Sequence, residues 1–145
     1  MSNNQVEADI KMDICCVREL SVENNNGSFI PSMNQEYNLQ IQHSDCSKDE
    51  SGRMIQSLRI TLIISAKDPE DDMTDKFKIV LEGQFSADKE IDQDKFEELV
   101  KYNGSSVLLS IARAKIEEVS SLSYANGKIT FPIVNMVKFF DSQEE

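Results

Sequence analysis

The side chains in this sequence that are best able to bind a metal or to react are one histidine and three cysteines. His43 stands three residues before Cys46, whereas Cys15 and Cys16 are adjacent. Imidazole and thiolate groups are ligands that zinc prefers, so these four residues are the candidates for a metal site. Adjacent residues of a strand point to opposite faces, however, so Cys15 and Cys16 are poorly placed to hold one ion. We therefore predict no metal centre and expect ordinary thiols at these positions.

Motifs for catalysis are missing from the sequence. It contains no glycine-rich phosphate loop, no Gly-x-Ser-x-Gly elbow and no His-Glu-x-x-His pair. Its 26 acidic side chains include no Asp/Glu pair in an apolar context, where a carboxyl pKa would shift toward general acid–base work. We therefore expect no enzyme activity and no cofactor, and we predict that the protein works by binding.

Charge and length narrow the class of partner further. The 15 basic and 26 acidic side chains give a net charge of −11, which does not attract a phosphate backbone or an anionic membrane. No apolar run approaches the roughly 20 residues that span a bilayer, and the N-terminus lacks the features of a signal peptide. The cysteine count is odd and follows no disulfide spacing, which favours a reducing compartment. We expect a cytoplasmic protein that neither binds nucleic acid nor inserts into a membrane.

Apolar residues alternate with polar ones in four segments, which is the period of a half-buried strand. In the first segment the even positions Met12, Ile14 and Leu20 are apolar, so we expect Glu19 and Glu23 on the solvent side. Asn24–Gly27 then predicts a turn. The four predicted strands cover about residues 10–23, 37–44, 54–64 and 77–81.

The periodicity becomes helical after the fourth predicted strand. Asp92 is a suitable N-cap for a short helix that ends near Tyr102. A longer helix follows from Ser105 or Ser106 to about residue 122, with apolar residues at spacings of three and four. A last amphipathic stretch covers residues 135–140. The sequence thus predicts the α+β class: a four-stranded antiparallel sheet followed by two main helices, which pack on one face.

Two apolar segments lie outside the predicted strands and main helices, one after the first strand and one near the C-terminus. They either cover sheet edges and complete the core, or together wall a groove for an apolar partner, as flexible methionine and aromatic side chains can. The seven candidate groove residues are Phe29, Ile30, Met33, Phe131, Met136, Phe139 and Phe140.

Three segments, in their order along residues 10–140, resemble the SecB family of protein-export chaperones. The first is Val-Arg-Glu-Leu-Ser-Val-Glu-Asn at residues 17–24. The second is Tyr-Asn-Gly at 102–104 with Leu-Leu-Ser-Ile-Ala-Arg at 108–113, and the third is Thr-Phe-Pro-Ile-Val-Asn-Met at 130–136. Departures occur as well: Ser110 and Ile111 stand where the family has Pro and Tyr, and Lys78 and Val80 where it favours Leu and Glu.

The resemblance implies an ATP-independent chaperone that holds unfolded or precursor polypeptides in a hydrophobic groove for export. It also implies a homotetramer, a dimer of dimers in which first strands pair and the helices lie between two sheets. Family members dock on the motor SecA through acidic residues, to which Glu19 and Glu23 correspond here. The alternatives are a SecB-like chaperone dedicated to one client, such as an antitoxin, and a non-chaperone interaction module.

Composition and the resemblance together predict three parts of the chain. Residues 1–9 are polar and lack periodicity, so we expect a disordered lead-in there. We expect a single SecB-like domain over residues 10–140 and a short acidic tail over residues 141–145. That tail is all that remains of the longer acidic tail of the family.

Overall fold

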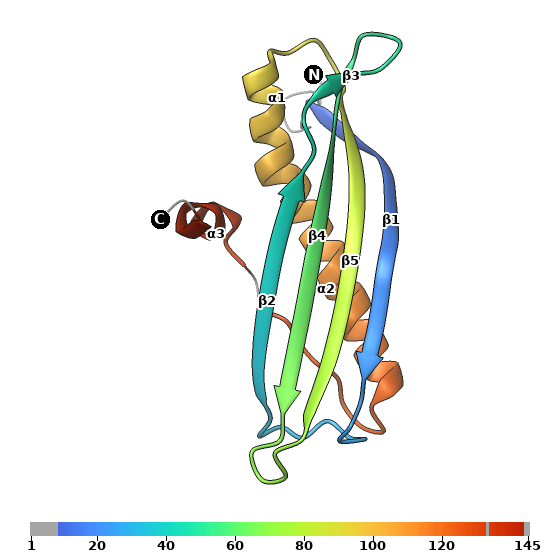
Figure 1. Ribbon diagram of the computed structural model, residues 1–145, viewed down its shortest axis with the longest axis vertical. Coiled ribbons are helices and arrows are strands. Elements are labelled where there is room, and N and C mark those ends of the chain that lie inside the picture. The colour runs from blue at the N-terminus through green and yellow to red at the C-terminus, as the bar shows by residue number, and fades with distance from the viewer. Residues whose placement is uncertain (1–8, 133, 144–145) are drawn as a thin grey trace, which may run out of the picture.

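A computed structural model describes residues 9–132 and 134–143, and it shows a long antiparallel sheet with helices on one face (Figure 1). The strands follow the order β1-β5-β4-β2, and a short β3 pairs with β4 off this path. The strands are β1 (Ile10–Glu23), β2 (Asn34–His43), β3 (Ser47–Lys48), β4 (Met54–Lys67) and β5 (Thr74–Ala87). The predicted α+β class is therefore confirmed.

The sheet has five strands rather than the four that we predicted. The additional β3 is only two residues long and pairs Ser47 with Ile55 and Lys48 with Met54. Two residues are too few to show an alternating pattern, so the segment reads as a polar loop in the sequence.

The alternation that we predicted for β1 is interrupted at two places. Register shifts between Met12 and Ile14 and between Val17 and Glu19 insert Asp13 and Arg18 as extra residues. Each β-bulge of this kind exchanges the two faces of the strand that follows it. Ile14 therefore lies opposite Gln84 on the outer face, not on the helix side as the sequence pattern indicated.

The two predicted helices form one helical run. α1 (Gln93–Leu99) passes through a π-helical segment, η2 (Val100–Gly104), into α2 (Ser105–Ser123). The predicted break at Tyr-Asn-Gly is therefore wrong, although Asp92 is the N-cap, as expected, and accepts a hydrogen bond from the Lys95 N–H at 2.8 Å. Gly104 lies close to Phe85 and Leu58, and a Cβ there would stand 3.1 Å and 3.2 Å from their side chains.

The core lies between the helical run and the central strands. α2 contacts β5 and β4, where Phe77, Phe85 and Leu108 are among the fully buried side chains. The apolar residues on the helix side of β1 are only partly covered: Val17 is 42% exposed and Leu20 is 46% exposed. The edge strand β1 therefore keeps an accessible apolar face.

Both ends of the predicted domain extend beyond the expected bounds. Asp9 is held at the sheet, because its carbonyl accepts from the Asp88 N–H at 2.8 Å and its carboxylate lies 3.0 Å from Lys89 Nζ. The last helix, α3 (Met136–Gln143), includes the first part of the predicted acidic tail. Residues 1–8 and 144–145 of the predicted lead-in and tail lie outside the described residues. None of the described helices is long and apolar enough to cross a membrane.

Candidate functional site

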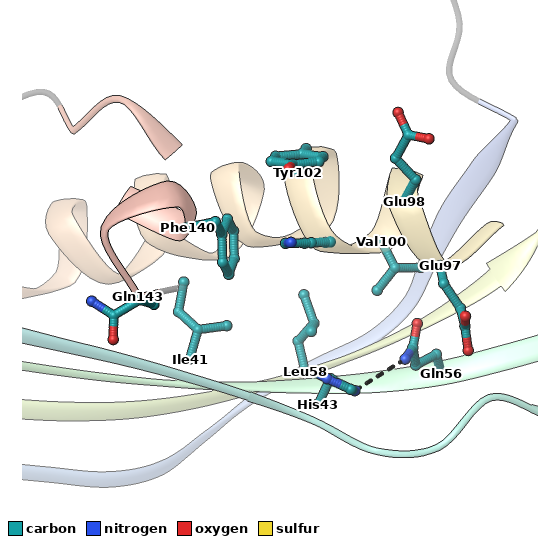
Figure 2. Close-up of a pocket in the computed structure, with 11 residues that line it drawn as sticks. Ile41, His43, Gln56, Leu58, Glu97, Glu98, Val100, Tyr102, Phe140 and Gln143 are labelled. Atoms are coloured by element: carbon teal, nitrogen blue, oxygen red, sulfur yellow. Dashed lines mark hydrogen bonds between the residues drawn. The ribbon is translucent and has the colours of Figure 1, made fainter. Parts of the chain in front are cut away.

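A hollow of about 650 Å³, here called the α3 pocket, opens between the sheet, the helical run and α3. Figure 2 shows Ile41 and Leu58 rising from β2 and β4 toward Val100 and Phe140. These four side chains form an apolar interior. Tyr102 contributes an aromatic ring to the lining. The remaining lining residues are polar or charged: His43, Gln56, Glu97, Glu98, Lys101 and Gln143.

One end of the α3 pocket is aromatic. The Phe140 ring meets Tyr102 edge-on, with centroids 5.6 Å apart, and meets Phe139 at 5.3 Å. Lys101 Nζ lies 5.2 Å from the centroid of Tyr102 and 5.0 Å from that of Phe140, within the range of a cation–π contact. Phe140 belongs to the short α3, which is also held to the core by its buried residue Met136.

The other end of the pocket carries hydrogen-bond acceptors. Gln56 is 5% exposed, and its Nε2 donates to the Ser44 carbonyl at 2.9 Å. Its Oε1 is buried without a hydrogen-bond partner among the described residues. Leaving such a group unpaired costs about 1–3 kcal/mol, and because its surface is covered, the accessible acceptors at this end are carboxylates. The carboxylates of Glu97 and Glu98 lie at the same end (Figure 2).

The structure separates the seven predicted groove residues. Phe140 lines the α3 pocket with Phe139 packed against it, whereas Phe131 and Met136 line a second hollow of about 230 Å³ beside α2. Phe29 packs on Tyr124 at the far end of the sheet, with ring centroids 5.8 Å apart. Phe29 belongs to the crossover, the segment over residues 24–33 that connects β1 to β2 at the opposite edge of the sheet. Ile30 is half-buried in this crossover, and Met33 at its end is 8% exposed. The client-binding role of the seven stays a prediction.

Four of the residues that build the α3 pocket are not among the predicted site residues: Ile41, Gln56, Leu58 and Val100. Ile41 belongs to an alternating strand pattern, and the other three carry no motif of their own. A signal was present for Ile41 and His43, because both lie on the apolar side of the second alternating segment. Nothing in the sequence indicates that this side ends in an open hollow rather than under a helix.

The thiols and the histidine do not form a metal centre within the described parts of the chain, where no three His, Cys, Asp or Glu side chains gather. Burial raises the pKa of the Cys15 thiol, and the neighbouring Cys16 adds to this effect. Burial also raises the pKa of Cys46, with a further contribution from Glu97. Both thiols are therefore protonated at neutral pH and are weak ligands and nucleophiles.

The two predicted docking residues lie on the outer face of the sheet, away from the helices. Glu19 Oε2 is 3.2 Å from Lys78 Nζ, and Glu23 pairs in register with Lys76. Neighbouring lysines thus offset part of this acidic surface.

Comparison with solved structures identifies the fold. The SecB-like chaperone Rv1957 of Mycobacterium tuberculosis, solved in complex with a ChAD peptide from the antitoxin HigA1, matches with a TM-score of 0.62. The match covers 88% of this chain and 91% of that chain at 11% identity. A protein of unknown function from Streptococcus agalactiae matches with a TM-score of 0.43 at 16% identity, over 86% of this chain and 97% of that chain. No protein-family model and no curated protein sequence matches the chain. The chain has a SecB-like fold.

Proposed function

We propose that this protein is an ATP-independent chaperone that holds unfolded polypeptide segments in the α3 pocket and the surface that continues from it. The observation that carries the proposal is the make-up of this pocket: apolar side chains, an aromatic wall on the short α3, and the carboxylate acceptors of Glu97 and Glu98. A polypeptide supplies both complements, apolar side chains and N–H donors. The SecB-like fold supports the same class of ligand.

The energetics favour several weak contacts along an extended client. Burying one large apolar side chain contributes about 1.5–3 kcal/mol. A few such contacts, less the cost of ordering the chain, are sufficient for micromolar binding. Such binding requires no nucleotide, and it tolerates different client sequences because apolar contacts are not directional.

Two kinds of client fit this proposal. Holding precursors for export is the function implied by the resemblance to SecB proteins. A dedicated antitoxin client is the second kind, and one observation favours it: the similar Mycobacterium tuberculosis chaperone was solved with a peptide from an antitoxin. Pull-down from the native cytosol, followed by identification of the bound proteins, separates the two, because an export chaperone captures many precursors and a dedicated one captures a single partner.

Suppression of aggregation tests the chaperone proposal. The protein should keep a chemically unfolded test protein from aggregating without ATP, and Phe140→Asp should weaken this effect several-fold because it places a charge in the α3 pocket. Ile30→Asp tests the predicted contribution of the crossover. Met73→Asp is the matched control, since Met73 is an exposed apolar residue next to the turn between β4 and β5.

The competing proposal is a non-chaperone interaction module. A dye that fluoresces on apolar surface, displaced by unfolded polypeptide, supports the chaperone. No dye signal and equal aggregation with and without the protein would remove the chaperone proposal.

We further propose that the protein is a homotetramer and that any docking on SecA is electrostatic. The accessible apolar face of β1 supports assembly, and Glu19 and Glu23 are the proposed docking residues. Titration of SecA from the same source should show binding at low salt that weakens at high salt. The double variant Glu19→Lys/Glu23→Lys should abolish it, and no binding at low salt would leave a chaperone independent of this motor.

A further inference from the structure

The outer edge of β2 is open along its whole length. β2 is the last strand in the order β1-β5-β4-β2, so a strand neighbours it only on the β4 side. Within residues 9–132 and 134–143, no backbone group of β2 makes a hydrogen bond outside its ladder with β4. A ten-residue strand whose outward-facing backbone donors and acceptors are free is a template for another extended chain.

The register determines which residues of β2 face that open edge. The Ser44 N–H donates to the Ser57 carbonyl at 2.9 Å, which continues the β2–β4 register by one pair. The antiparallel alternation then turns the backbone groups of even-numbered residues toward β4 and those of odd-numbered residues toward the open edge. The odd-numbered residues from the middle of β2 onward are Tyr37, Leu39, Ile41 and His43.

The same odd-numbered residues direct their side chains to the helix side. Leu39 pairs with Leu62 and Ile41 with Ile60, and both partners are fully buried in the core. Cross-strand partners share a face of the sheet. Ile41 therefore offers free backbone groups at the edge and a side chain in the α3 pocket.

The chemistry of this edge specifies an extended polypeptide. Only another backbone in the extended conformation can pair with a regular row of N–H and C=O groups. In an added strand, every second side chain would join the apolar side of β2, and one of these would enter the α3 pocket beside Ile41. The intervening side chains would join the outer face of β2, which is polar because it carries Asn38, Gln40 and Gln42.

The two edge strands of the sheet, β1 and β2, differ, and the differences favour β2 as the edge to which an extended chain is added. Ile41 and His43 of β2 line the α3 pocket, whereas the residues that line this pocket and the hollow beside α2 include none from β1. β2 also pairs with β4 without a register shift, so its ten residues form one regular edge, while β1 contains two bulges.

We propose that the client binds as an added β-strand along the open edge of β2, with alternate side chains turned toward the helices and one of them in the α3 pocket. This inference rests on the proposed chaperone function and adds how the client backbone is recognised. Affinity then comes from main-chain hydrogen bonds that every sequence can make, and selectivity comes from the pocket.

Peptides with methylated amides test the role of the backbone. The probe is a fluorescein-labelled peptide of twelve alternating leucine and threonine residues with two lysines at each end. One derivative carries N-methyl groups on leucines and the other on threonines, so each loses the donors of one edge while all side chains are kept. Binding is measured by fluorescence anisotropy.

One derivative should bind at least tenfold more weakly than the other. Loss in the leucine series indicates an antiparallel strand, because there the residues that bond to β2 also face the helices; loss in the threonine series indicates a parallel strand. Equal affinity of the two derivatives overturns the proposal while leaving side-chain binding intact. Failure of the unmethylated peptide to bind overturns this proposal and the proposed function together.

Amide hydrogen exchange locates the added strand. Amides at the odd positions Leu39, Ile41 and His43 should exchange rapidly in the free protein and become protected when the unmethylated peptide binds, while exchange along β1 stays unchanged. Protection of these amides already in the free protein overturns the proposal, because a second copy of the chain then closes the edge. Protection gained only along β1 also overturns it.

Discussion

At the scale of single residues, the carboxylate of Asp75 joins three separate parts of the chain. It is fully buried at the start of β5 and accepts hydrogen bonds from the N–H groups of Asn25 and Asn26 at 2.6 Å and 2.9 Å. The Tyr124 hydroxyl, just after α2, donates to its other oxygen at 2.6 Å. This cluster therefore holds the turn after β1 against the end of α2, where Phe29 also packs.

Removal of the Asp75 carboxylate should lower the free energy of unfolding by about 3 kcal/mol, because the buried Tyr124 hydroxyl and two partly buried backbone N–H groups lose their acceptor. Urea denaturation of Asp75→Ala measures this change. Tyr124→Phe is the matched variant that removes one of the three bonds, and we expect a loss of about 1 kcal/mol. Equal stability of Asp75→Ala and the wild type would contradict the structural role of the cluster.

The same carboxylate should make stability depend on acid. Burial by itself would raise the pKa of Asp75, but the hydrogen bonds from Tyr124, Asn26 and Asn25 outweigh it and keep the pKa below its ordinary value. The unfolded chain then binds more protons near pH 4 than the folded protein. The contribution of Asp75 is therefore complete at neutral pH and is lost as the pH falls below about 4.

Urea denaturation between pH 3 and about pH 7 measures this dependence. The wild type should lose more stability on acidification than Asp75→Asn, which has no proton to bind at this position. Parallel pH profiles for the two proteins would contradict the prediction.

At the scale of elements, the close approach of α2 to β5 depends on Gly83. A Cβ at this position would lie 2.9 Å from Leu108 Cδ2 and 3.1 Å from Phe85 Cε2. Both neighbours are buried, so neither side chain can move into free space. Glycine is therefore required here by packing, since its own φ is an ordinary one.

Gly83→Ala should destabilise the protein by about 1–3 kcal/mol, the usual range for overpacking a core. Thermal unfolding measured by circular dichroism shows the change. Gln84→Ala is the matched control, because Gln84 points to the other face of the same strand, and we expect a change within about 0.5 kcal/mol. A stabilised Gly83→Ala would show that α2 shifts freely on the sheet.

At the scale of the whole molecule, apolar surface remains on the side of the sheet that carries the helices. Val17, Leu20 and Val22 of β1 pair in register with Leu81, Ile79 and Phe77, so they face the helices, yet each stays more than a third exposed. Leu122 of α2 is 78% exposed. The surface is suited to contact with further copies of the chain.

Light scattering at micromolar concentration should give about four times the chain mass of 16.4 kDa if the proposed tetramer forms. Leu20→Arg should reduce that mass, because it places a charge in the apolar surface. Ser21→Arg lies on the opposite face of β1 and should leave the mass unchanged. A monomeric wild type would remove the proposed tetramer.

Local patterns in the sequence were enough to predict the class of this protein. Alternation through residues 54–64 and the helical spacing after Asp92 report which side of each element is buried, and that property is set by near neighbours along the chain. They predicted an antiparallel sheet with helices on one face, which is the observed fold. The proposed chaperone function was suggested by three segments that resemble SecB proteins in the same order, since no residue type or spacing specifies it.

The bulges in β1 and the α3 pocket, in contrast, were decided by contacts between distant parts of the chain. The bulges at Asp13 and Arg18 exist only in the register of β1 against β5, and no pattern within β1 predicts them. The α3 pocket unites Ile41, Val100 and Phe140, which lie in three elements and meet only after the sheet, the helical run and α3 have packed. Long-range packing, unlike periodicity, leaves no signature in a single segment, and for this reason only the tertiary structure showed the pocket beside an open strand edge.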